Sequence, residues 1–246
     1  MNPGLDYGAS ALNALQKWQD VTALNISSNV YTGHKQQVVA FEAAGGTKDA
    51  SFDNVMQAVT PKAVVTTDFA PGKVIPTGNP TDIGITSAKG FFKLETPGGD
   101  VVYSRDGEFH FNQDYTLVNK QGYIVQANGG AIVKNPNKGE ISINPDGKVY
   151  QGKTLINQLT LYDFNDKAAL IKVNGGYSFP PDKPVPEEAV EKPTFLQGAL
   201  EHSNSNPIME MVALIQVSRA MESNMTAMKS LDEQMGRAIQ FLNPMG

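Results

Sequence analysis

Cysteine is absent from the 246-residue chain and histidine is scarce. Without cysteine the chain can form no disulfide, no thiolate metal site and no thiol nucleophile. Its histidines, His34, His110 and His202, lie far apart in sequence and lack the spacings of zinc sites. We therefore expect no metal, no cofactor and no catalytic residue.

The chain also lacks clusters of basic residues and long apolar runs. Its net charge is −5, whereas nucleic acids and anionic membranes attract a basic surface. No run reaches the ~18 apolar residues of a membrane span. The first twenty residues contain neither the basic nor the apolar region of a cleavable signal peptide. We expect no nucleic-acid partner and no membrane insertion, and composition alone indicates a cytoplasmic protein.

Acidic residues are numerous, but most of them stand beside glycine or asparagine, as in Asp106-Gly107 and Asp146-Gly147. At such positions an aspartate commonly accepts hydrogen bonds from its own turn. A glycosidase would instead need two carboxylates that face one cleft. The turn interpretation is favoured, and we expect the protein not to be an enzyme.

Two long segments, one near each end of the chain, are predicted to be helical. They run from about Pro3 to about Tyr31 and from about Pro207 to about Leu242. Each opens with Asn-Pro, which suits the N-cap and the first helical position. Gly33 is expected to end the first helix in a left-handed conformation.

The middle of the chain, from about Lys73 to Tyr177, alternates short β-favouring runs with turn signals. Asp106-Gly107, Gln121-Gly122 and Asp146-Gly147 stand where hairpin turns are expected. This pattern predicts a mainly β central domain of short antiparallel strands, barrel-like or sandwich-like, inserted between the terminal helices.

The predicted elements divide the chain into three regions. Residues 1–35 with 200–246 form a helical assembly domain, and residues 73–179 form the β-rich outer domain. Residues 36–72 with 180–199 form an extended connecting region. Its second part contains PPDKPVPEEAVEKP, and repeated proline excludes a helix or a central strand there.

Both helices carry apolar lines at heptad spacing, which predicts a coiled-coil pair and self-assembly. Small residues in the first helix, including Gly8 and Ala11, would permit close helix approach. The flanking line of the second helix has two polar interruptions, Ser218 and Asp232. The predicted seam is Leu5, Leu12, Leu15 and Ile26 in the first helix, and Met211, Leu214, Met221, Met225, Met228, Met235, Ile239 and Leu242 in the second.

The first helix is apolar on more than one side. Trp18, Val21 and Leu24 lie partly off its seam, so one helical partner would not cover it. The simpler alternative is an intramolecular helix pair that caps a single domain. Methionine-rich seams favour association, because methionine adapts to several packing arrangements.

Four motifs in one order resemble the bacterial flagellar rod and hook proteins. They are LNISSNVYTGHK, PTGNPTDIGITSAKGFFKL, YSRDGEFHFNQDYTLVNKQGYIV and LQGALEHSNSNPIMEMVALIQVSRAMESNM. His34 stands where the family motif has phenylalanine. Length and the ending MGRAIQFL are more similar to proximal than to distal rod members. The family-motif residues are Asn25, Asn29, Gly33, Asn204 and Asn206.

This resemblance implies a structural axial subunit of the flagellar basal body that assembles helically into the torque-transmitting rod. It implies terminal helices paired as a coiled coil, and partners among its own copies and other axial proteins. It also implies unprocessed export by the flagellar type III apparatus to a rod within the periplasm, which would replace the cytoplasmic assignment. The alternative is a β-rich binding module with a coiled-coil oligomerisation stalk.

Overall fold

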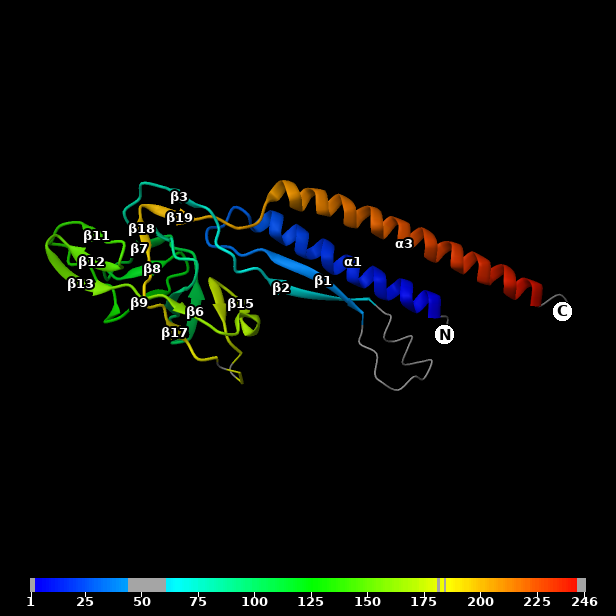
Figure 1. The fold of residues 1–246 in the computed structure, drawn as a ribbon, viewed down its shortest axis with the longest axis horizontal. Coiled ribbons are helices and arrows are strands. Elements are labelled where there is room, and N and C mark those ends of the chain that lie inside the picture. The colour runs from blue at the N-terminus through cyan, green and yellow to red at the C-terminus, as the bar shows by residue number, and fades with distance from the viewer. Residues whose placement is uncertain (1–2, 44–60, 181, 184, 243–246) are drawn as a thin grey trace. The chain divides into compact units, whose positions relative to one another are not determined.

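The computed structural model describes residues 3–43, 61–180, 182–183 and 185–242 (Figure 1). The chain divides into two compact units. Unit 1 consists of Met1–Ser27, Gln37–Asp68 and Ser205–Gly246, and unit 2 consists of Ser28–Gln36 and Phe69–Asn204. The chain therefore passes from one unit to the other four times.

Unit 1 contains two helices and a β-hairpin. The helices are α1 (Pro3–Ser28) and α3 (Pro207–Leu242), and the hairpin joins β1 (Gln37–Ala43) to β2 (Pro61–Thr67) in antiparallel register. Within this unit α1 lies between α3 and the hairpin, and the two helices run antiparallel (Figure 1). The first helix therefore has partners on two sides, one of them a hairpin.

The helix boundaries follow from local capping. Asn206 caps α3, because its side-chain oxygen accepts from the backbone N–H groups of Ile208 at 3.0 Å and Met209 at 3.4 Å. The expected Asn-Pro start of this helix is thus confirmed. Helix α1 ends at Ser28, three residues before the expected Tyr31. Gly33 has a φ of +66° but lies well beyond the helix end, so the prediction that it ends α1 is wrong.

Unit 2 is built from short strands, and all of their pairings in the described residues are antiparallel. The elements are β3 (Val74–Pro76), β4 (Ile83–Ile85), β5 (Phe92–Glu95), β6 (Val101–Ser104), β7 (Phe109–Phe111), β8 (Leu117–Asn119), β9 (Ile124–Ala127), β10 (Gly130–Ala131), β11 (Ile141–Ile143), β12 (Lys148–Gln151), β13 (Thr154–Gln158), β14 (Tyr162–Asp163), the 3-10 turn η1 (Lys167–Ala169), β15 (Ile171–Val173), β16 (Gly176–Ser178), β17 (Glu188–Ala189), β18 (Phe195–Gln197) and β19 (Ala199–Glu201).

The largest sheet of unit 2 has eight strands in the order β15-β16-β6-β5-β9-β8-β7, with β10 paired to β9. A three-stranded sheet, β11-β12-β13, and the pairs β14-β17, β18-β4 and β19-β3 complete the unit. The order of the large sheet is an open path that ends at β15 and β7. The β character is confirmed, and the barrel or sandwich form is not.

Two hydrophobic clusters hold unit 2 together. The larger one contains fully buried aliphatic and aromatic side chains from most of the sheets, among them Leu94, Val125 and Val149. The smaller one is aromatic, with Phe164 packed edge-on against Tyr103 at a centroid distance of 4.6 Å. These clusters give unit 2 a core of its own.

Two of the three predicted hairpin turns are confirmed. Gly122 joins β8 to β9 and Gly147 joins β11 to β12, both with positive φ. The turn predicted at Asp106-Gly107 is wrong, because β6 pairs with β5 and β16 and not with β7. Glycine is needed there for another reason: a Cβ at Gly107 would lie 1.9 Å from the carbonyl oxygen of Ile83.

The structure groups the segments of the predicted connecting region with the units. Residues 37–68 belong to unit 1, and within them β1 and β2 pair along seven residues each. Residues 180–199 belong to unit 2, where β17 pairs with β14 and β18 pairs with β4. The proline-rich segment thus contributes only one short strand among its described residues.

Candidate assembly surface

Helices α1 and α3 approach each other closely at Gly8. A Cβ placed on Gly8 would lie 2.8 Å from Cγ of Met228, closer than such contacts occur. Gly8 is buried, and so are Ala14 and Val21 on the same helix. Small side chains at the contact let the flexible methionine of α3 pack directly on the α1 backbone.

Asn25 joins three elements of unit 1 through one buried amide. Its Nδ2 donates to the backbone oxygen of Gln37 at 2.8 Å and to Oε1 of Glu210 at 3.1 Å. Its Oδ1 accepts from the backbone N–H of Gln37 at 2.9 Å. The amide therefore ties α1 to the first residue of β1 and to the first turns of α3.

The hairpin covers a second side of α1. The rings of Trp18 and Phe41 meet edge-on with centroids 5.7 Å apart. The sequence predicts burial of α1 on more than one side but offers no sign that a hairpin supplies part of it. The apolar residues of β1 alternate too weakly with polar ones for the sequence to predict that this strand packs on α1.

The predicted α3 seam falls on two different faces. Leu214, Met221, Met228 and Met235 are half-buried, whereas Met211 and Met225 are exposed. Glu210 and Val217 are buried. They stand one position before Met211 and Ser218, which belong to the predicted flanking line. Leu12, Leu15 and Ile26 of α1 are half-buried, and the side chains of Leu5, Ile239 and Leu242 lie outside the described residues.

A continuous apolar stripe occupies the outer side of the first turns of α3. Its members are 44–71% exposed, and four of them follow i, i+3, i+4, i+7 spacing, which places them on one helix face. We call this stripe the α3 apolar face, and it consists of Ile208, Met209, Met211, Val212 and Ile215. Large exposed apolar patches mark sites of protein association.

A buried ion triad in unit 2 joins one residue from each of three quoted motifs: Lys35, Arg105 and Glu201. Glu201 accepts from Lys35 Nζ at 2.6 Å and from Arg105 Nε at 2.7 Å, and all three side chains are 0–1% exposed. Gly72 donates its backbone N–H to the same carboxylate at 2.7 Å. Lys35 belongs to residues 28–36, and Glu201 is the last residue of β19, 166 positions later in the sequence. The triad therefore fixes residues 28–36 to the strands of unit 2.

The remaining motif residues make backbone contacts. The carbonyl of Asn204 accepts from the N–H of Gln36 at 2.7 Å, and its amide donates to Ala70 at 3.1 Å. Gly33 donates to the backbone oxygen of Glu201 at 2.7 Å, and a Cβ on Gly33 would lie 2.3 Å from Asp106 N. Asn29 lies in the turn after α1. Asn204 and Gly33 thus hold backbone segments of unit 2 in place.

The described residues contain no group of three His, Asp or Glu side chains that could hold a metal ion. In the same part of the chain, no helix combines the length and the apolarity that a membrane crossing requires. Aspartates serve turns as expected: Asp146 accepts from the N–H of Lys148, and Asp166 caps η1.

Comparisons with known protein families match two parts of the chain. Residues 86–151 match the model of the flagellar hook protein FlgE/F/G D1 domain, and residues 196–241 match the flagellar basal body rod FlgEFG protein C-terminal model. A flagellar basal-body rod protein FlgF from Mesorhizobium japonicum is 30% identical over 246 residues, with 98% of both chains covered.

Other relatives agree along the whole length. A FlgF from Rhizobium meliloti is 29% identical, with 98% of both chains covered. A flagellar basal-body rod protein FlgG from Buchnera aphidicola is 28% identical, covering 98% of this chain and all of that protein. Relatives of the proximal type, FlgF, thus match at least as well as those of the FlgG type.

The fold and these matches define a structural protein of the bacterial flagellum. The chain belongs to the flagellar basal-body rod protein family. It is a structural subunit of the rod and not an enzyme, and the family implies interaction with other axial components of the basal body. The resemblance seen in the four sequence motifs is confirmed.

Proposed function

We propose that this protein is a proximal-rod subunit that assembles helically through α1 and α3 to form part of the torque-transmitting shaft. In the assembled rod, α1 and α3 of each subunit pair as a coiled coil. Their remaining apolar surface packs against neighbouring copies and other axial proteins. A head-to-tail contact of this kind does not close, and it therefore generates a filament.

The observation that carries this proposal is the α3 apolar face. Its five side chains are 44–71% exposed in the single chain. Burying a Met, Ile or Val side chain fully contributes about 1.5–3 kcal/mol. A neighbouring subunit that covers this face would therefore gain several kcal/mol, before the cost of ordering and association.

The coiled-coil pairing is supported by the close contact between Gly8 and Met228. It is also supported by the buried and half-buried line Glu210, Leu214, Val217, Met221, Asn224 and Met228, which alternates steps of three and four residues. Such steps are typical of a helix seam that keeps facing its partner. The seam residues Met211 and Met225 are proposed to face neighbouring subunits instead.

We propose the periplasm as the site of assembly, reached by unprocessed export through the flagellar type III apparatus. Membership of the flagellar basal-body rod protein family supports this route. A shaft of this kind transmits torque mechanically, so dense packing between subunits matters more than any single chemical group.

The test places an acidic residue on the α3 apolar face. Ile208→Asp with Ile215→Asp should leave the isolated chain folded, since both side chains are exposed. The double variant should abolish swimming and recovery of intact rods from cells, while Val133→Asp, an exposed site in unit 2, should preserve both. Normal rods from the double variant would refute assembly through this face. A discrete soluble oligomer in place of rods would instead favour a β-rich binding module.

A further inference from the structure

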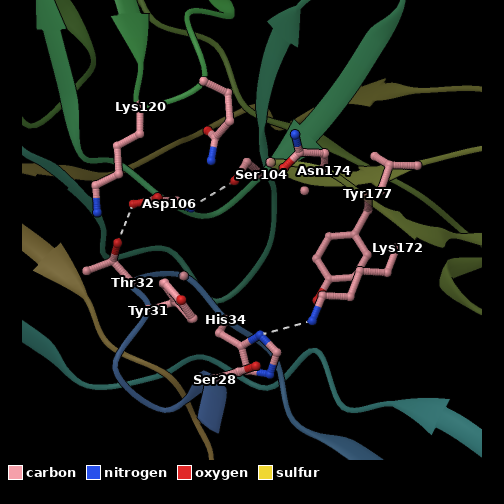
Figure 2. A pocket seen from close by; sticks show the side chains of 15 residues that line it. Ser28, Tyr31, Thr32, His34, Ser104, Asp106, Lys120, Lys172, Asn174 and Tyr177 are labelled. Carbon is pink, nitrogen blue, oxygen red and sulfur yellow. Dashed lines mark hydrogen bonds between the residues drawn. The ribbon is translucent and has the colours of Figure 1, made fainter. Parts of the chain in front are cut away.

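A pocket of about 330 Å³ with both polar and apolar walls lies in unit 2. Its walls come from residues 28–34, the link between β6 and β7, the β8-β9 turn, and strands β15 and β16. Figure 2 shows Lys172 beside His34 on one side, and Asp106 with Thr32 and Lys120 on another. None of these side chains belongs to the α3 apolar face or to the predicted helix seam.

Lys172 is a cation without an acidic partner among the described residues. Its Nζ lies 3.4 Å from Nδ1 of His34, and none of the ion pairs found in that part of the chain includes it. An ammonium group can only donate, so Nδ1 accepts and His34 is held as the neutral tautomer protonated on Nε2. Partial burial lowers the pKa of Lys172, which is the expected effect of desolvation without a compensating carboxylate.

His34 occupies this position at a cost in stability. Its side chain is buried, and Nε2 has no hydrogen-bond partner in the described structure. An unsatisfied buried donor costs about 1–3 kcal/mol. Phenylalanine, the residue of the motif that this segment resembles, would avoid that cost. What His34 supplies and phenylalanine cannot is an acceptor that orients the ammonium of Lys172.

The acidic groups in and near the pocket, Asp106 and Glu108, have other partners. Asp106 accepts from Thr32 Oγ1 at 2.5 Å and from the backbone N–H of Glu108 at 3.1 Å. Lys120 pairs with Glu108 at 2.6 Å. Among the described residues, both of these carboxylates therefore have other partners and neither pairs with Lys172.

We propose that this cavity is a carboxylate-binding site in which Lys172 supplies the ion pair and His34 positions Lys172. An ammonium group can donate to a carboxylate with its remaining hydrogens while one stays on His34. The carboxylate comes either from a small organic acid or from an Asp or Glu side chain of a neighbouring axial subunit. Both sources present the same chemistry to Lys172, and they are separated by experiment.

The first arm uses sodium acetate and the isolated full-length protein at constant ionic strength. Backbone amide signals of His34, Lys172 and Tyr177 should shift saturably. Lys172→Met should weaken acetate binding by about tenfold, the usual effect of losing a charged hydrogen bond. His34→Phe should weaken it severalfold, and Lys153→Met, at an exposed lysine of the β12-β13 turn, should not change it.

The second arm treats isolated basal bodies with a carbodiimide, which joins an amine to an adjacent carboxylate as an amide. Mass spectrometry should find Lys172 linked to an Asp or Glu of another chain, and Lys172→Arg should keep the rod but remove the link. The pair Lys93–Glu187, with Nζ and Oε1 2.6 Å apart, provides an internal positive control.

Each outcome decides the proposal. Saturable acetate binding that depends on Lys172 supports a small-acid site, and a Lys172 link to another chain supports a subunit contact. Neither result, with the Lys93–Glu187 link present, would overturn the carboxylate site. Because all cavity residues belong to unit 2, failure here leaves assembly through α1 and α3 unaffected, and the reverse also holds.

Discussion

Units 1 and 2 differ in how completely each buries its apolar residues. Every one of the largest fully buried side chains of the described residues belongs to unit 2, including Phe92, Leu94 and Glu201. In unit 1 the described residues contain only three buried hydrophobic side chains, Ala14, Val21 and Val217, while α3 exposes its apolar face. Unit 2 is stabilised by its own core, and unit 1 leaves much of its apolar surface uncovered.

This difference separates two tasks within one chain. Buried apolar area is the main source of folding free energy, so unit 2 should resist unfolding as an isolated protein. Unit 1 exposes apolar surface that the proposed rod assembly would bury. The following predictions test that contrast, and Trp18, the one tryptophan in the sequence, provides a fluorescence signal specific to unit 1.

The largest effect is expected at the buried triad of unit 2. Glu201→Gln removes the charge of the carboxylate that pairs with two buried cations, Lys35 and Arg105. Such a change should lower the free energy of unfolding of unit 2 by about 3–5 kcal/mol. Urea unfolding followed by near-ultraviolet circular dichroism measures this. Glu140→Gln, at an exposed position, should change it by less than about 0.5 kcal/mol, and equal losses would contradict the triad's role.

A pH-dependent loss is expected from His34. Burial first, then the charges of Lys172 and Lys35, lowers the pKa of His34 from 6.5 to about 4. Below pH 6.5 the unfolded chain takes up a proton that the folded chain refuses. The contribution of neutral His34 to the free energy of unfolding is therefore complete above pH 6.5, and it is lost as the pH falls toward 4.

At pH 5 the loss due to His34 should be about 2 kcal/mol relative to pH 7.5. His34→Phe should remove that part of the pH dependence, and urea midpoints at the two pH values measure it. His110→Phe, at an exposed position on β7, serves as the control. An unchanged pH dependence in His34→Phe would show that His34 is not held neutral by its surroundings.

A smaller effect is expected at the junction of unit 1. Asn25→Ala removes three hydrogen bonds and leaves the backbone groups of Gln37 and the carboxylate of Glu210 without that partner. The loss should be about 1–3 kcal/mol and should appear in Trp18 fluorescence during urea unfolding. Asn13→Ala, on an exposed position of the same helix, should be neutral or slightly stabilising. A neutral Asn25→Ala would mean that the junction does not hold unit 1 together.

The smallest effects separate two methionines of α3. Met228→Ala should cost about 1 kcal/mol in the isolated chain, because Met228 packs on Gly8 and is half-buried. Met225→Ala should change the free energy of unfolding by less than about 0.5 kcal/mol, since its side chain is 45% exposed. Equal losses at the two positions, measured by Trp18 fluorescence, would contradict the assignment of Met228 to the inner face.

Features governed by local chemistry could be predicted from the sequence. Asn206-Pro207 marks the start of α3, because a cap needs only its own next turns. Gly122 and Gly147 mark hairpins, because a positive φ favours glycine. The hairpin predicted at Gly107 is wrong, because a close approach by Ile83 requires glycine there just as a turn would.

Features that depend on distant pairing were missed. Lys35, Arg105 and Glu201 look like surface residues, since charged side chains are rarely buried unless they are paired. Hydrophobicity alone places Met211, and not its neighbour Glu210, on the flanking line of α3. In the structure Glu210 is buried because Asn25, 185 positions earlier in the chain, donates to it.

That separation of 185 positions has a consequence for the timing of synthesis. At about 5–20 residues per second, roughly 10–40 s pass between the emergence of Asn25 from the ribosome and that of Glu210. During this interval α1 waits without its helical partner, while most of unit 2 can already fold.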